Sequence, residues 1–198
     1  MRLVFASTNS AKLAEVVGIA RRFGIDLQGL DSISTLGRGP VPLIVEGSPS
    51  YYDNAREKAL AYAQWSGLSC IADDAGLEVH SLGSLPGVYT ARFGFCRVRD
   101  ALLSGVSYEA TFRCCMCFSD VNRRTVAVES AVSGLVAFPP GVAPPASSVP
   151  YSSYFTPQGE TETLAALVSR GSFQSHRALA FRKLANVLDL TALEVDQG

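Results

Sequence analysis

Two long apolar segments in the middle of the chain constrain its fold most. Residues 110–119 and 124–138 each have the composition of a strand, and the turn Asp120-Val121-Asn122 between them predicts one long β-hairpin. Elsewhere strand-like and helix-like patterns follow one another along the chain. This mixture predicts an α/β or α+β protein with a mixed sheet.

The other predicted elements are of ordinary length. Leu13, Val16, Val17 and Ala20 have helical spacing, and this helix is expected to end near Gly24. The remaining predictions are strands over 2–6, 26–30 and 70–72, helices over 49–65, 164–168 and 175–188, and loops over 31–48, 83–94 and 139–150. Pro49 is expected in the first turn of its helix, Gly67 at its end, and Ser175 as the cap of the last helix.

Composition excludes several classes of protein. Hydrophobic residues make up 47% of the 198 residues and charged residues 18%, which excludes a disordered chain. No apolar run reaches the length of a membrane span. A net charge of −1 argues against a nucleic-acid partner. Five cysteines, three of them crowded into Cys114-Cys115-Met116-Cys117, suit buried free thiols in a cytoplasmic protein better than a disulfide framework or a zinc site.

A polar turn follows the first predicted strand. It reads Ser7-Thr8-Asn9-Ser10-Ala11-Lys12 and leads into a predicted helix. Free N–H groups at a helix start, with an ammonium nearby, favour a phosphate. The alternative is an ordinary capping box, in which Ser or Thr caps the helix and Lys12 lies in solvent.

Adjacent carboxylates follow the predicted strand 70–72. Asp73 and Asp74 lose solvation there and repel each other, so they suit Mg²⁺ binding or proton transfer from water. An ordinary turn with both side chains in water is the alternative. Glu46 gains significance only if it lies near this pair.

The last predicted helix begins with Ser175-His176-Arg177. An arginine fork suits a phosphate or a carbonyl edge, and a histidine suits a base carbonyl. Two surface side chains beside a helix cap are the alternative. His80 is expected on a strand without a role, and no Gly-x-Ser-x-Gly motif or Cys–His spacing supports a covalent hydrolase.

Four segments carry a resemblance to a known family. They are Ser7-Thr8-Asn9-x-x-Lys12; Glu46 with Tyr51-Tyr52-Asp53-Asn54-Ala55 and Lys58-Ala59; Ala72-Asp73-Asp74-Ala75-Gly76-Leu77 with Pro86-Gly87-Val88-Tyr89-Thr90-Ala91-Arg92; and Ser175-His176-Arg177. Together they resemble the pyrophosphatases that act on non-standard purine nucleoside triphosphates, the inosine/xanthosine triphosphatase or Ham1-like (RdgB-like) family.

The resemblance implies a fold and a reaction. The fold would be α/β, an elongated mixed β-sheet flanked by helices with a central cleft, of the inosine triphosphatase/Maf-like kind. Residues 1–198 would form a single domain with two lobes, and the protein would be a cytoplasmic homodimer. The reaction would be Mg²⁺-dependent hydrolysis of ITP, dITP or XTP to the monophosphate and pyrophosphate, which removes deaminated purines from the nucleotide pool.

The resemblance also implies roles for single residues. Asp74 would be the catalytic proton acceptor, and Mg²⁺ would be bound by Glu46 with Asp73 or Asp74. Substrate would be bound by Ser7, Thr8, Asn9 and Lys12 at the phosphates, by Ala75 in the place of a family serine, and by His176 and Arg177 at the purine.

The chain departs from the family where the base would bind. A Gly-Phe-Gly-Tyr-Asp-Pro segment is expected near residues 147–152, where the chain has Ser-Ser-Val-Pro-Tyr-Ser, and a family lysine falls near Gly171. Tyr151, Tyr154 or Phe155 is a candidate replacement for the stacking ring. Two alternatives stay open: a catalytically weakened or inactive nucleotide-binding member with altered base specificity, and a pyrophosphatase for modified pyrimidine nucleotides.

Overall fold

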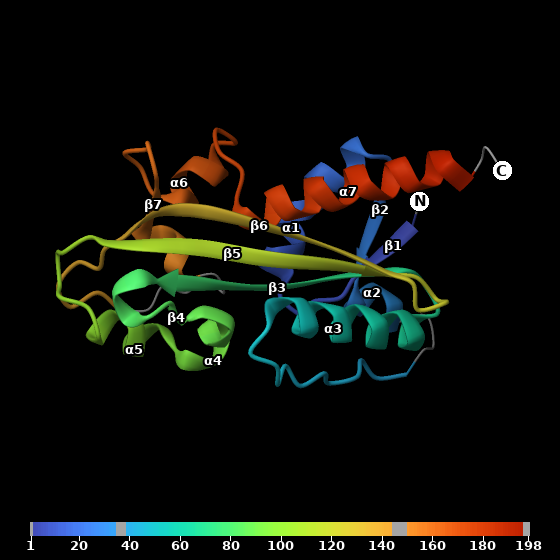
Figure 1. The fold of residues 1–198 in the computed structure, drawn as a ribbon, viewed down its shortest axis with the longest axis horizontal. Helices are drawn as coiled ribbons and strands as arrows, with labels where there is room; N and C mark the ends of the chain where they lie inside the picture. The colour runs from blue at the N-terminus through green and yellow to red at the C-terminus, as the bar shows by residue number, and fades with distance from the viewer. Residues whose placement is uncertain (1, 35–38, 144–149, 196–198) are drawn as a thin grey trace. The chain divides into compact units, whose positions relative to one another are not determined.

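A computed structural model describes residues 2–34, 39–143 and 150–195. The described strands form one mixed sheet in the order β2-β1-β3-β5-β6-β7, with β4 paired to β3 (Figure 1). They are β1 (Arg2–Phe5), β2 (Asp26–Gly29), β3 (Cys70–Val79), β4 (Leu85–Pro86), β5 (Tyr108–Ser119), β6 (Thr125–Val136) and β7 (Phe155–Pro157). The predicted hairpin is confirmed as β5 and β6.

The chain divides into two compact units. The first contains residues 1–74, 115–129 and 177–198, and the second contains residues 75–114 and 130–176. The predicted Pro-rich loop falls partly outside the described residues, because 144–149 are not among them.

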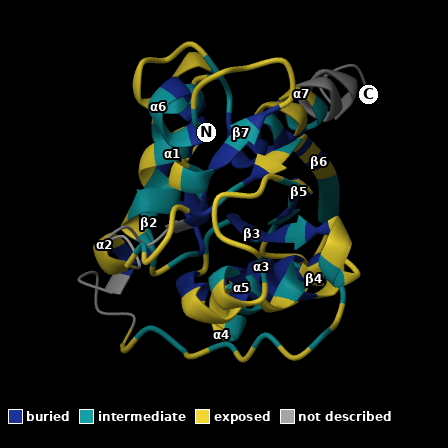
Figure 2. Ribbon diagram, turned by 90° about the vertical axis from the view of Figure 1, so that its left-hand side faces the viewer, coloured by how far each residue is buried: buried dark blue, intermediate teal, exposed yellow. Residues whose placement is uncertain are grey.

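In the first unit β1 pairs in parallel with both β2 and β3, and its last pair with β3 is Phe5↔Ile71. Helices α1 (Ser10–Arg22) and α7 (His176–Val195) lie on one face of these strands, and α3 (Tyr51–Ser66) lies on the other (Figure 1). The short helix α2 (Leu30–Ser34) occupies part of the predicted loop 31–48. Buried residues concentrate on β1 and β3 (Figure 2).

Local chemistry sets the ends of α3. The helix begins at Tyr51, because the Ser50 side chain accepts a hydrogen bond from the Asp53 N–H group, and so Pro49 precedes the cap instead of lying in the first turn. Gly67 ends the helix with φ of 67°, a left-handed conformation that glycine adopts without steric cost. The predicted C-terminal glycine is confirmed.

The second unit contains β4, β7 and several short helices. They are α4 (Thr90–Phe93), α5 (Phe95–Asp100), α6 (Leu164–Ser169) and the 3₁₀ helices η1 (His80–Leu82), η2 (Gly87–Tyr89) and η3 (Pro150–Tyr154). His80 therefore begins a 3₁₀ helix and is not on a strand. Gly76 packs so closely against the next turn that an added Cβ atom would lie 2.0 Å from the Gly87 carbonyl oxygen.

The cysteines are free thiols. Cys70, Cys114, Cys115 and Cys117 are buried and Cys96 is exposed. Burial raises the pKa of the Cys70 and Cys117 thiols to about 11, which keeps them protonated at neutral pH. Over the described residues, no helix has the length and apolarity needed to cross a membrane.

Candidate active site

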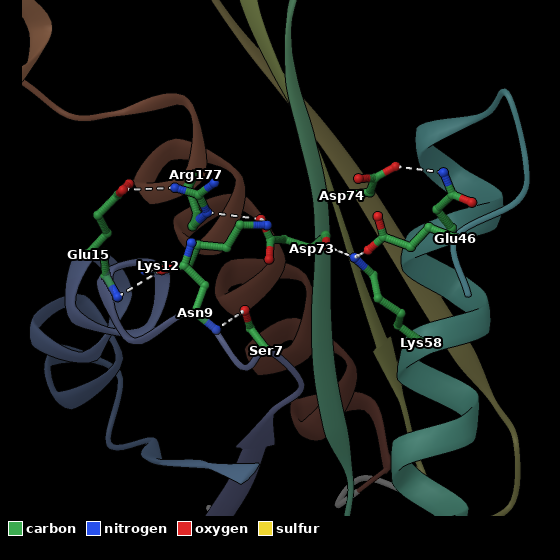
Figure 3. Close-up of polar contacts among 11 residues, drawn as sticks. Ser7, Asn9, Lys12, Glu15, Glu46, Lys58, Asp73, Asp74 and Arg177 are labelled. Atoms are coloured by element: carbon green, nitrogen blue, oxygen red, sulfur yellow. Dashed lines mark hydrogen bonds and ion pairs between the residues drawn. The ribbon is translucent and has the colours of Figure 1, made fainter. Parts of the chain in front are cut away.

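Two adjacent aspartates on β3 organise the candidate site. Strand β3 runs on past its last pairing with β1 at Ile71, so Asp73 and Asp74 lie inside the strand and not in a turn after it. Neighbouring side chains of a strand point to opposite faces of the sheet. Asp73 accordingly points to the face covered by α1 and α7, and Asp74 to the face covered by α3 (Figure 3).

The turn between β1 and α1 lies beside Asp73. Asn9 is the N-cap of α1, and its Oδ1 accepts hydrogen bonds from the N–H groups of Ala11 at 3.0 Å and Lys12 at 3.4 Å. The Ser7 hydroxyl oxygen accepts one from the Asn9 N–H group at 3.1 Å, and Thr8 is exposed. A side chain of this turn therefore does cap the helix, but it is Asn9 and not the expected serine or threonine.

Lys12 is not left in solvent by this cap. Its ammonium lies 3.1 Å from Asp73 Oδ2, and its side chain is 21% exposed. Arg177 Nε on α7 donates to the same oxygen at 2.9 Å, and Arg177 Nη1 donates to Glu15 Oε1 on α1 at 2.8 Å (Figure 3). Two cations from two helices thus meet one oxygen of a buried carboxylate.

Asp73 remains ionised in this setting. Burial alone acts to raise its pKa, but the charges of Lys12, Arg177 and Lys58 and the Arg177 hydrogen bond hold it far below the usual range. Its second oxygen, Oδ1, is buried and has no hydrogen-bond partner among the described residues. A buried carboxylate oxygen without a hydrogen-bond donor favours a bound cation or a donor from a ligand.

On the face of the sheet covered by α3, Lys58 is the central cation. This α3 lysine is buried, and its ammonium donates to Glu46 Oε1 and to the backbone carbonyl of Asp73 (Figure 3). Burial acts to lower its pKa, but the charges of Asp73, Glu46 and Asp74 raise it above the ordinary value. Lys58 thereby links Glu46 to β3 at Asp73, which meets the condition under which that glutamate gains significance.

The segment that carries Glu46 is attached to α3 on both sides of the glutamate. The Tyr62 hydroxyl donates to the Pro42 carbonyl at 2.9 Å. The Ser48 N–H group donates to Asn54 Oδ1 at 3.1 Å, and Asn54 Nδ2 donates back to the Ser48 carbonyl at 3.0 Å. Helix α3 therefore sets the position of Glu46.

Asn54 also contacts the second aspartate. Its Nδ2 donates to Asp74 Oδ2 at 2.8 Å, and both side chains are buried. Burial raises the pKa of Asp74, and the Glu46 charge adds to this, against the lowering effect of Lys58, Asn54 and Lys12. The two neighbouring aspartates therefore have pKa values moved in opposite directions, an arrangement typical of carboxylates with separate roles.

The structure does not gather the three predicted metal ligands into one cluster. Within the described part of the chain, no group of three or more His, Cys, Asp or Glu side chains is placed to bind a metal ion. Mg²⁺, however, needs only one or two carboxylates when substrate phosphates and water complete its octahedron. The roles of Glu46, Asp73 and Asp74 as metal ligands stay predictions.

The other predicted substrate residues fall in different surroundings. In the second unit, the His176 imidazole stacks on Phe112, with 4.6 Å between ring centroids and 4° between planes. Ala75 is half-buried on β3. Their contacts with substrate, and that of Arg177 with the purine, stay predictions; in this structure the Arg177 fork binds Asp73 and Glu15.

The three proposed replacement rings all pack against other aromatic rings, and two of them are buried. Phe155 is buried against Phe112, with ring centroids 4.8 Å apart, and Tyr151 is buried against Phe95 at 5.5 Å. Tyr154 is half-buried, and its ring centroid lies 5.4 Å from that of Phe95 and 5.3 Å from that of Phe138. Neither buried ring offers a free face for a base.

Sequence reasoning assigned no role to Lys58, Asn54 or Glu15. A signal for two of them is present: Asn54 and Lys58 are four residues apart, next to the apolar stripe Ala55, Ala59 and Tyr62 of α3. Polar residues beside a buried helical stripe lie close to the sheet, where a buried lysine requires carboxylate or carbonyl partners. Glu15 follows Lys12 by three residues and thus shares its face of α1.

Comparison with known proteins identifies the family of the chain. A model of the Ham1 family matches residues 3–187. The chain belongs to the Ham1 family. A relative from Nitratidesulfovibrio vulgaris, named dITP/XTP pyrophosphatase, is 32% identical across 92% of this chain and 93% of its own. One of the same name from Anaeromyxobacter dehalogenans is 45% identical, but over 47% of this chain and 38% of its own length.

Solved Ham1 structures have the same fold. The Ham1 protein of Coxiella burnetii superposes with a TM-score of 0.75 at 27% identity, over 96% of this chain and 98% of its own. The Staphylococcus aureus Ham1 protein gives 0.73 at 26% identity with the same coverage. The predicted α/β fold, a mixed sheet flanked by helices, is confirmed.

Proposed function

We propose that this Ham1 protein hydrolyses ITP, dITP and XTP to the nucleoside monophosphate and pyrophosphate in a Mg²⁺-dependent reaction. The names of its full-length relatives support this substrate class. The observation that carries the proposal is the pair Asp73 and Asp74, one kept ionised by two cations and the other buried beside a single amide donor.

Mg²⁺ fits the oxygen donors on β3 and beside α3. Carboxylate oxygens are the ligands that this ion prefers, and the unpartnered Asp73 Oδ1 requires a cation or donor. Glu46 and one of the two aspartates would bind the ion. When bound, it would neutralise charge that develops on the phosphate oxygens.

The phosphates would lie at the start of α1. The carboxyl ends of parallel strands, where a helix begins, are a common position for phosphate groups. The hydroxyls of Ser7 and Thr8 lie there, and Lys12 would bridge Asp73 and the triphosphate with its ammonium. Asp73 would keep Lys12 in place and charged.

Asp74 would accept the proton of the attacking water. Burial raises its pKa, which makes its carboxylate a better proton acceptor than an exposed aspartate. Lys58 would keep Glu46 close to the aspartates and offset their mutual repulsion. His176 and Arg177 would contact the purine, as the family resemblance implies.

The test is a comparison of nucleotides with Mg²⁺ present. We expect pyrophosphate release from ITP, XTP and dITP with kcat/KM well above that for ATP, and a rate about 10²- to 10⁴-fold lower from the Asp74→Asn variant. Equal rates with ATP would overturn the substrate class, and full activity in Asp74→Asn would remove Asp74 from the mechanism. Nucleotide binding in calorimetry without hydrolysis over hours would favour the alternative of an inactive binding protein.

A homodimer and a cytoplasmic location remain part of the proposal. The four buried free thiols suit a reducing compartment. Light scattering of the purified protein tests the dimer, because a mass of one chain would contradict it.

A further inference from the structure

We infer that Asn54 is a positioning residue for Asp74: its side-chain amide holds Asp74 Oδ2, so that Oδ1 is the oxygen presented to the attacking water. The inference rests on the proposed function and extends it to a residue on α3. Asn54 is 1% exposed and lies 20 positions before Asp74 in sequence, so the contact is made by the fold and not by local chain geometry.

The orientation of the Asn54 amide is fixed by the backbone of Ser48. The Ser48 N–H group is a donor, so the side-chain atom that faces it at 3.1 Å must be the Asn54 oxygen. Nδ2 then has two hydrogens, one for the Ser48 carbonyl at 3.0 Å and one for Asp74 Oδ2 at 2.8 Å. A flipped amide would place two donors against each other at Ser48.

This fixed amide distinguishes the two oxygens of Asp74. Oδ2 faces an N–H donor, so it acts as an acceptor and cannot carry a hydrogen toward Asn54. Oδ1 is then the oxygen on which a proton from water would arrive. A carboxylate held by one oxygen also loses rotational freedom, which keeps the second oxygen in one place for the reaction.

The same amide connects Asp74 to the segment of Glu46. Ser48 is two residues after Glu46, and both of its backbone polar groups bind Asn54. Asn54 therefore ties two acidic residues, 28 positions apart in sequence, to one point on α3. A purely structural role, in which Asn54 fastens only the segment around Ser48, is the competing explanation.

A double-mutant cycle separates the two explanations. We expect Asn54→Ala to lower kcat for ITP about 10- to 100-fold, the usual effect of losing a hydrogen bond to a charged group, and to change KM less than about threefold. In the Asp74→Asn background the same substitution should lower the residual rate less than about threefold, because the group it positions is already gone.

Ser66→Ala is the matched control. Ser66 is a buried polar residue at the far end of α3, and its hydroxyl lies 3.3 Å from the Leu68 carbonyl oxygen. Its loss should lower the melting temperature and leave kcat unchanged. Asn54→Asp, which keeps the size of the side chain and the acceptor for the Ser48 N–H group, provides the second variant if Asn54→Ala does not fold, and we expect the same loss of kcat.

Several outcomes would overturn the inference alone. The inference fails if the folded Asn54 variant keeps its kcat, or if the substitution lowers the rate equally in the wild-type and Asp74→Asn backgrounds. It also fails if KM rises while kcat is retained. A wild-type protein without pyrophosphatase activity on any of the nucleotides would instead overturn the proposed function, and this inference with it.

Discussion

Substituting each of the two adjacent aspartates by asparagine should separate stability from turnover. In Asp73→Asn, the ammonium of Lys12 and the guanidinium of Arg177 lose the carboxylate that both contact within 3.1 Å. Asp73 is 1% exposed and Arg177 side-chain exposure is 3%, so water does not replace the lost partner. Removing one partner of a buried ion pair costs about 3–5 kcal/mol of unfolding free energy.

The expected shift is large enough to measure by calorimetry. For a protein of this length each kcal/mol lowers the melting temperature by roughly 2–4 °C, so Asp73→Asn should melt about 6–20 °C below wild type. Asp74→Asn keeps the shape of the side chain, and burial already disfavours the charge that it removes. It should melt within about 4 °C of wild type, while the rate of pyrophosphate release falls about 10²- to 10⁴-fold.

Differential scanning calorimetry at pH 7, with circular dichroism to confirm folding at the start, provides the comparison. An Asp73→Asn protein that melts within 4 °C of wild type would refute the reasoning, because Asp73 would then not stabilise the two cations. So would an Asp74→Asn protein that is as unstable as Asp73→Asn, because both aspartates would then be structural.

Four further predictions concern pH, the buried lysine and a crowded glycine, two of them on pH. The pKa of Asp73 is lowered in the folded state, so its contribution to stability is complete above its unfolded pKa of about 3.9 and is lost as pH falls below that value. The free energies of unfolding of wild type and Asp73→Asn, measured in urea, should therefore approach each other by about 1.4 kcal/mol for each pH unit below about 3.9. Asp74 has a raised pKa, so the stability of Asp74→Asn relative to wild type should increase as pH rises above about 4 and become constant once the raised pKa is passed. A difference that does not change with pH would contradict this effect of burial. Lys58→Met leaves Glu46 and the aspartates without their shared cation and should reduce unfolding free energy by about 3 kcal/mol in urea titrations; unchanged stability would mean that the carboxylates do not depend on it. Gly76→Ala places a Cβ atom 2.0 Å from a backbone oxygen and should cost about 3 kcal/mol, whereas a wild-type melting curve would show that the turn at Gly87 gives way.

The elements that sequence predicted best are those with strong periodicity or clear boundary residues. The hairpin of β5 and β6, helix α3 with Gly67 at its end, and the strand–turn–helix at Asn9 all agree with expectation. Short elements were missed, among them α2, α5 and β7, because a few residues carry no measurable period and their formation depends on tertiary contacts.

The candidate site was predicted in composition but not in arrangement. Asp73 and Asp74 were expected after the end of a strand, where both side chains would reach one ion; the strand continues, and its pleat turns them to opposite faces. The spacing of charged residues in the sequence also does not show which lysine or arginine pairs with which carboxylate. The roles of Lys58 and Asn54 follow only when α3 is packed on the sheet, since their partners are 12 to 20 positions away.

The identity of the products tests the central claim most directly. Phosphorus NMR of ITP incubated with the protein and Mg²⁺ should show inosine monophosphate and pyrophosphate appearing in equal amounts, and no reaction once a chelator has removed the ion. Inosine diphosphate and orthophosphate as the products would contradict the account.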